Sequence, residues 1–104
     1  SDVYKRQVEF SVNPHVSKKY GLTAGAMYSL FSYLWPSYAS KNGFFKVSIR
    51  YMHETFPGST VEDIRKAFSE MERERDIETL GYREDIPYDK DFYIMPNYYG
   101  EAEK

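Results

Sequence analysis

The segment that most restricts the fold of this chain follows a Pro57-Gly58 break and reads STVEDIRKAFSEMERER over residues 59–75. Ser59 and Glu62 have the spacing of a capping box, in which two side chains satisfy backbone N–H groups at the start of a helix. Apolar residues then recur at intervals of three and four, the spacing of one buried helical face. These residues are Val61, Ile64, Phe68 and Met71, with Ala67 beside them. The pattern predicts a capped, amphipathic helix with a charged outer face.

A shorter helix is predicted on the other side of the Pro-Gly break. Residues 44–47, FFKV, read as a short strand that leads into it. Ser48 is a favourable N-cap residue, and Ile49, Met52 and Phe56 follow with helical spacing. Two capped helices joined by a tight turn predict a helix-turn-helix.

Upstream, residues 8–12 alternate between apolar and polar side chains, which predicts a short strand or an extended arm. Asn13-Pro14 is expected to break this segment. A long helix is then expected with Thr23 as its N-cap, and Pro36 is expected to end or kink it. Its buried face is predicted from helical spacing to be Met27, Leu30, Phe31 and Leu34.

Downstream, two strand-like runs, DIETL (residues 76–80) and DFYIM (residues 91–95), are joined by the ten residues GYREDIPYDK. The chain of 104 residues shows no internal repeat and is long enough for one compact domain. We assign residues 8–97 to this domain and residues 98–104 to a polar C-terminal tail. Residues 1–7, SDVYKRQ, resemble the heptapeptide read from a sequencing adapter at the end of a metagenomic contig, so we treat them as a candidate non-native segment.

Charge is divided unevenly along the chain, although the formal net charge is only -2. Residues 1–58 carry seven Lys/Arg and three Asp/Glu, whereas residues 59–104 carry seven and thirteen. This asymmetry predicts one basic and one acidic face. Cysteine is absent, which excludes disulfides and thiolate metal sites. The most apolar stretch, AGAMYSLFSYLW, is about half the length of a bilayer span. We see no signal peptide and expect a cytoplasmic protein without a membrane partner.

The order of predicted elements resembles a winged helix-turn-helix domain, and the resemblance covers residues 8–97. Its most specific part is KVSIRYMHETFPGSTVEDIRKAFSEMERERDIETL. The preceding FSVNPHVSKKYGLTAGAMYSLFSYL resembles the N-terminal winged helices of replication-initiation proteins from plasmids, phages and Gram-positive bacteria. The resemblance implies an α+β fold with a three-helix core and a C-terminal β-hairpin wing. It also implies binding of double-stranded DNA in a phage or plasmid replication or regulatory system.

In DNA-binding members of this family the start of the third helix reads base edges and nearby cations hold phosphates. Carried over by position, the residues expected to read bases are Ser59, Thr60, Glu62, Asp63 and Lys66. Those expected to hold phosphates are Lys46, Arg50, Lys66 and Arg73, with Lys41 and His53 as further candidates. The acidic wing would then point away from the DNA. Self-association through residues 8–12 or the tyrosine-rich tail would make the protein a homodimer and strengthen its binding.

Two alternatives to DNA binding remain open at the level of sequence. Glu62–Lys66 and Lys66–Glu70 are four residues apart, as are Ser69 and Arg73, so the outer face of the third helix can be an ion-paired, solvated surface. The acidic, tyrosine-rich C-terminal half can instead bind a protein, as in an assembly adaptor or a small phage-type inhibitor. The residues expected to form that surface are Tyr82, Asp85, Tyr88, Asp89, Tyr98 and Tyr99, unless the tyrosines only pack the hairpin onto the third helix.

Catalysis is not expected. The two histidines, His15 and His53, are far apart in sequence, and no nucleophile, phosphate-loop or dinucleotide motif is present. The acids of residues 84–91 lack the spacing of a calcium loop. We therefore expect no cofactor and no metal.

Overall fold

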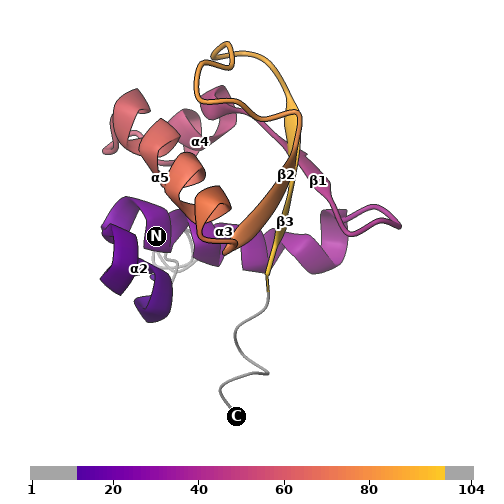
Figure 1. Ribbon diagram of the computed structural model, residues 1–104, viewed down its shortest axis with the longest axis horizontal. Helices are drawn as coiled ribbons and strands as arrows, with labels where there is room; N and C mark the ends of the chain where they lie inside the picture. The colour runs from indigo at the N-terminus through magenta and orange to yellow at the C-terminus, as the bar shows by residue number, and fades with distance from the viewer. Residues whose placement is uncertain (1–11, 98–104) are drawn as a thin grey trace, which may run out of the picture.

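The computed structural model describes residues 12–97, which contain four helices and three strands (Figure 1). The α+β class expected from the sequence is confirmed. The elements are α2 (Pro14–Tyr20), α3 (Leu22–Tyr38), β1 (Phe45–Val47), α4 (Ile49–Thr55), α5 (Val61–Arg73), β2 (Ile77–Leu80) and β3 (Phe92–Pro96).

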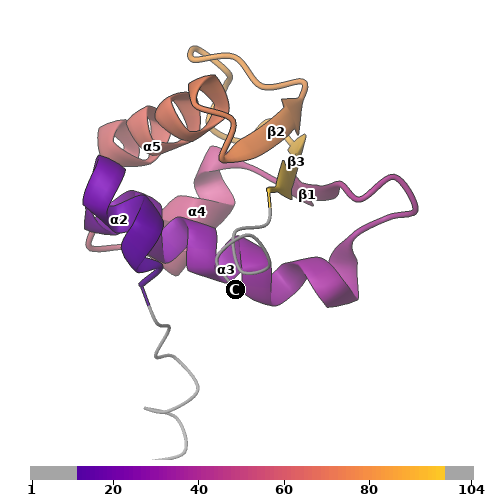
Figure 2. The same ribbon diagram turned by 60° about the horizontal axis from the view of Figure 1, so that its bottom comes forward.

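The three strands form one antiparallel sheet in the order β1-β3-β2. The hairpin predicted from residues 76–95 is therefore confirmed, and β1 adds to its far edge, where Phe45 lies opposite Ile94. Side chains alternate along the strands: Phe45, Val47 and Ile94 are buried, whereas Lys46 and Tyr93 are exposed. One face of the sheet is thus apolar, and the helices lie against it (Figure 2).

Aromatic rings join the two layers. Phe68 of α5 stacks on Phe31 of α3 with ring centroids 5.8 Å apart, and it meets Phe92 of β3 edge-on at 5.0 Å. Tyr82, which follows β2, lies 5.1 Å from Phe92 and 5.7 Å from Phe68. Phe31, Phe68 and Phe92 are almost completely buried, so this cluster fixes the inner face of α5 and the position of the chain after β2.

The N-terminal part of the fold differs from the prediction. Asn13 and Pro14 begin helix α2 instead of only breaking the chain: the Asn13 side chain accepts a hydrogen bond of 2.9 Å from the Val16 N–H, and Pro14 occupies the first helical position. Gly21 then reverses the chain with a φ of 102°, a conformation that favours glycine. Helix α3 begins directly afterwards at Leu22, so Thr23 is not its cap. Pro36 does not end α3, which continues to Tyr38.

Helices α2 and α3 approach each other closely at Gly25. A Cβ atom added to Gly25 would lie 2.6 Å from Ser17 Cβ and 2.6 Å from Val12 Cγ1. The Gly25 carbonyl also accepts a hydrogen bond of 3.2 Å from the Asn13 N–H. The absence of a side chain at Gly25 therefore sets the distance between the two helices.

We expect Gly25→Ala to lower the free energy of unfolding by about 1–3 kcal/mol, because the added methyl group overpacks this contact. A loss of stability would be informative, because alanine in an unconstrained helix is about 1 kcal/mol more favourable than glycine and would raise the stability. Urea unfolding of the variant tests this. Gly58→Ala is the control, since nothing lies within 4 Å of the Cβ position there. An unchanged or increased stability of Gly25→Ala would contradict the close packing.

A buried carboxylate ties α2 to the junction of α5 and β2. The side chain of Asp76 is 2% exposed; it accepts a hydrogen bond of 2.5 Å from the Tyr20 hydroxyl, and Lys19 Nζ lies 3.3 Å from both carboxylate oxygens. Burial and the bond to Asp76 raise the pKa of Tyr20 to about 12. Burial and the charge of Asp76 likewise raise the pKa of Tyr28 to about 12. The folded protein therefore holds both phenolic protons more tightly than the unfolded chain does.

Alkaline pH should accordingly destabilise the fold. A group whose pKa is raised on folding contributes its full stability below its unfolded pKa, here 10.0, and loses it as the pH rises through about 12. We expect the free energy of unfolding to fall between these pH values. In Tyr20→Phe the fall should be shallower, from a neutral-pH stability that is lower by about 1–3 kcal/mol. Urea unfolding across this pH range measures both slopes, and equal slopes would refute the role assigned to Tyr20.

Candidate nucleic-acid interface

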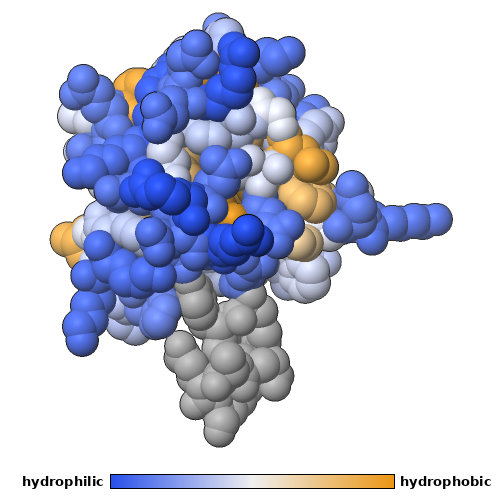
Figure 3. Space-filling view, viewed as in Figure 1, coloured by the Kyte–Doolittle hydropathy of each residue, from blue (hydrophilic) through white to orange (hydrophobic). Residues whose placement is uncertain are grey.

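Helix α5 presents a polar outer face, as its sequence pattern predicts. Ile64, Ala67, Phe68 and Met71 are buried against the core. Val61 is partly buried against the same core, whereas Glu62, Asp63, Lys66 and Arg73 are exposed. Hydrophilic residues cover most of the molecular face on which α5 lies, with hydrophobic surface confined to small areas (Figure 3). This face can meet a polar or charged partner.

The start of α5 is shifted by one residue from the predicted capping box. The N-cap is Thr60, whose hydroxyl accepts a hydrogen bond of 3.0 Å from the Asp63 N–H. The Ser59 hydroxyl instead shares a hydrogen bond of 2.9 Å with the Thr23 hydroxyl of α3. Ser59 and Thr23 thus join the α4–α5 turn to α3. Of the residues predicted to read bases, Ser59 is occupied by this contact, whereas Thr60, Glu62 and Lys66 stay exposed in the first turns.

The cations of α5 are not neutralised by their helical neighbours. The alternative in which Lys66 pairs with Glu62 or Glu70 is not observed: within residues 12–97 neither Lys66 nor Arg73 forms an ion pair. Ser69, predicted to support Arg73, shares a hydrogen bond of 2.6 Å with the Tyr82 hydroxyl. Lys66 and Arg73 lie at one surface cavity of about 360 Å³. The other residues that line it are Arg65, Ser69, Glu70 and Glu84.

Two predicted phosphate-binding cations outside α5 are paired. Lys46 of β1 lies 3.8 Å from Asp91, and Arg50 of α4 lies 3.6 Å from Asp89 and 3.0 Å from Glu54. Asp89 and Asp91 of the acidic hairpin loop therefore lie beside cations that are expected to hold phosphates, although the wing was expected to point away from the DNA. All five side chains are more than half exposed.

The loop between β2 and β3, residues 81–91, is packed onto α5. The guanidinium of Arg65 donates hydrogen bonds of 3.0 Å and 2.7 Å to the carbonyls of Glu84 and Ile86. The Tyr82 hydroxyl donates one of 3.1 Å to the Arg65 carbonyl. Ile86 and Tyr82 are 3% and 8% exposed. Tyr82 is thus part of the core and cannot serve as the protein-docking residue predicted from the sequence.

The same loop is held to α4 through Tyr88. Its carbonyl accepts a hydrogen bond of 3.0 Å from the Arg50 N–H, and its hydroxyl lies 3.0 Å from His53 Nδ1. Tyr88 stays 36% exposed, and Asp85 is exposed and paired with Arg83 at 3.3 Å. These two and Asp89 are the members of the predicted protein-binding surface that the structure leaves accessible. Tyr98 and Tyr99 lie outside the described residues, as do residues 1–7 and most of the 8–12 arm.

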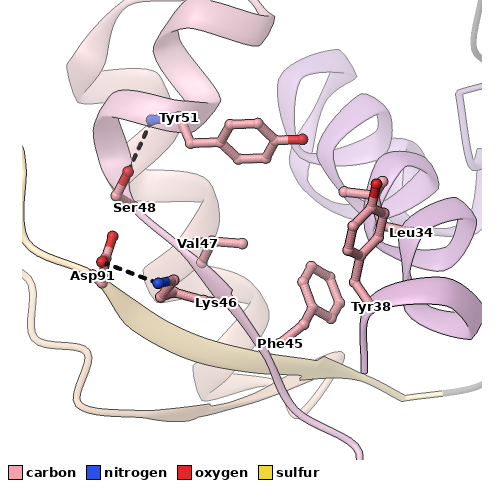
Figure 4. A pocket seen from close by; sticks show the side chains of 8 residues that line it. All are labelled: Leu34, Tyr38, Phe45, Lys46, Val47, Ser48, Tyr51 and Asp91. Carbon is pink, nitrogen blue, oxygen red and sulfur yellow. Dashed lines mark hydrogen bonds and ion pairs between the residues drawn. The ribbon is translucent and has the colours of Figure 1, made fainter. Parts of the chain in front are cut away.

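A groove of about 470 Å³ adjoins Lys46 (Figure 4). It lies between the C-terminal part of α3, strand β1 and helix α4. The rings of Tyr38, Phe45 and Tyr51 border it, with Leu34 and Val47 beside them and Ser48 and the Lys46–Asp91 pair at one end. Sequence reasoning assigned no role to Tyr38 or Tyr51. Tyr38 follows Pro36, which was expected to end or kink the helix, so nothing in the sequence indicated that these rings face one space.

Within the described part of the chain, no group of three or more His, Cys, Asp or Glu residues comes together as a metal site. None of the helices there combines the length and the apolar character needed to cross a bilayer. No protein-family model matches the chain, and no curated protein or solved structure matches it significantly.

Arg65 was not among the residues predicted to have a role, yet its hydrogen bonds should hold the 81–91 loop in place. We expect Arg65→Met to lower the free energy of unfolding by about 1–3 kcal/mol, because it removes two charge-assisted hydrogen bonds and leaves two carbonyls without their donor. Lys66→Met is the matched control, since Lys66 is the next residue along the helix and its side chain is exposed. Its effect on the free energy of unfolding should stay within about 0.5 kcal/mol. Thermal or urea unfolding of the two variants tests this, and equal effects would contradict it.

Proposed function

We propose that this chain is a winged helix domain that binds double-stranded DNA through α5. The order α3, β1, α4, α5, β2, β3 supports the proposal, because it places a capped third helix directly before a β-hairpin. Strand β2 of that hairpin follows α5 after residues 74–76 and contacts it. The sequence resemblance to replication-initiation winged helices favours a role in phage or plasmid replication or its regulation. In such domains the third helix enters the major groove.

The observation that carries the proposal is the pair of cations on the outer face of α5. Lys66 and Arg73 are exposed, border one cavity and have no carboxylate partner within residues 12–97. Pairs within the helix would contribute only about 0.2–0.5 kcal/mol, so both cations are available to an anionic ligand. Glu62 does not oppose this reading, because a carboxylate in the groove can accept a hydrogen bond from the amino group of cytosine.

Lys46 and Arg50 provide a second set of phosphate contacts, for which DNA competes with the carboxylates of Asp91 and Asp89. Their ion pairs with Asp91 and Asp89 are longer than 3.5 Å and exposed, and such pairs contribute only about 0–1 kcal/mol. Phosphates can therefore replace the loop carboxylates at modest cost. With few phosphate contacts and an acidic loop nearby, a single domain should bind weakly, with a Kd of about 10⁻⁴–10⁻⁶ M in the absence of a specific site.

Fluorescence anisotropy with a labelled random-sequence duplex tests the proposal. We expect binding at low salt that weakens as salt rises, since each phosphate contact releases counterions. Lys66→Glu or Arg73→Glu should weaken binding by about tenfold and reduce the log–log salt slope by about 1. Lys18→Glu, an equal charge change at an exposed position of α2 to which no DNA contact is assigned, is the control. No binding by the folded protein at low salt, or equal losses in all three variants, would refute the proposal.

The paired cations give a second test, in which the variant is expected to bind DNA more tightly instead of more weakly. Asp89→Asn with Asp91→Asn should strengthen duplex binding several-fold and steepen the salt slope, because Lys46 loses its carboxylate partner and Arg50 keeps only Glu54. Asp85→Asn with Glu78→Gln removes the same charge from exposed positions that pair with neither cation. It should therefore raise affinity less. Equal gains from the two double variants would show that only net charge matters.

The protein-interaction alternative keeps one supporting observation: Asp85 and Tyr88 remain exposed on the 81–91 loop. Asp85→Lys with Asp89→Lys would abolish such an interaction and leave DNA binding intact or stronger. This alternative becomes the leading hypothesis if the folded protein does not bind the duplex.

A further inference from the structure

The groove beside Lys46 combines aromatic walls with charged groups at one end. Tyr38 of α3 and Tyr51 of α4 are 68% and 39% exposed, whereas Phe45 of β1 is 5% exposed and forms the inner wall. In Figure 4 the three rings, each from a different element, surround the same open space. The volume of about 470 Å³ is within the range of small-molecule sites, roughly 300–1,000 Å³.

The charged end of the groove offers both a donor and an acceptor. Lys46 Nζ and the Asp91 carboxylate lie 3.8 Å apart, and their side chains are 61% and 57% exposed. Because this ion pair is long and solvated, it contributes little to stability and both groups can turn to a ligand. A ligand that suits the groove therefore has a flat face for the rings, an amino group for Asp91 and a negative charge for Lys46.

We propose that this groove binds an unpaired base of single-stranded DNA. Tyr51 and Tyr38 supply the surfaces on which the base stacks, since every base has an aromatic face that such rings accept. Asp91 accepts a hydrogen bond from an exocyclic amino group, and Lys46 binds the adjoining phosphate. A purely apolar peptide would leave Asp91 and Lys46 without a role, so the charges at the rim favour the nucleotide.

The inference rests on the proposed function and deepens it, because Lys46 also belongs to the predicted duplex surface. A single strand held beside a duplex occurs where DNA is opened. The domain would then bind a junction between paired and unpaired DNA more tightly than either part alone. This ligand class is distinct from the duplex proposed for α5.

The test measures a single strand and a duplex separately. The probes are fluorescein-labelled oligodeoxycytidine and oligodeoxythymidine of about ten nucleotides, and a blunt duplex. We expect Tyr51→Ala and Tyr38→Ala to weaken oligodeoxycytidine binding by about tenfold and leave duplex binding unchanged. Tyr51→Phe, which keeps the ring, should bind normally. Tyr33 lies on α3, the helix of Tyr38, but outside the groove, and it is 70% exposed. The Tyr33→Ala variant should therefore also bind normally.

Oligodeoxycytidine should bind more tightly than oligodeoxythymidine, which lacks an amino group, and Asp91→Asn should remove this preference. The site would be refuted if the folded protein bound no single strand, or if Tyr33→Ala weakened binding as much as Tyr51→Ala. Equal binding of the two oligonucleotides would refute the role of Asp91. Loss of duplex binding alone would refute the α5 proposal and leave the groove result standing, so the two failures are distinguishable.

Discussion

The arrangement of the whole domain depends on the aromatic cluster around Phe68. Its ring meets Phe31 of α3, Phe92 of β3 and Tyr82 beyond β2, at centroid distances of 5.0–5.8 Å. These contacts orient α5 with its apolar residues inward, so the charged residues necessarily face solvent. Through Tyr82 they also bring the 81–91 loop onto α5, where Arg65 binds two of its carbonyls. The candidate interface is a consequence of this packing.

Periodicity was sufficient to predict the elements after residue 44. Helices α4 and α5 and the β2–β3 hairpin lie where apolar spacing and turn residues placed them, because those segments bury one face each. The helix before Gly21 was missed, since Asn13-Pro14 is compatible with a chain break and with a helix start, and only the burial of Val16 against the core decides between them. The shift from Ser59 to Thr60 has the same origin: Thr23, distant in sequence, binds Ser59.

The sequence was sufficient to predict which cations belong to the candidate site, but not which of them form ion pairs. Sequence identified Lys46, Arg50, Lys66 and Arg73, and all four are exposed. Helical spacing offered Lys66 a partner in Glu62, a pair that does not form, whereas the folded loop brings Asp89 and Asp91 to Arg50 and Lys46. Contacts that depend on where the 81–91 loop folds cannot be predicted from local spacing. The groove between Tyr38 and Tyr51 is of this kind, since its walls come from three elements.

The central claim is that the outer face of α5 contacts DNA. An amide chemical-shift titration of the ¹⁵N-labelled protein with a short duplex tests it most directly, because it locates the contact residue by residue. The account predicts that the largest shifts fall on the outer face of α5, at Thr60, Glu62, Lys66 and Arg73, with smaller ones at Lys46 and Arg50. Shifts that avoid α5, or no shifts from a folded protein at low salt, would contradict it.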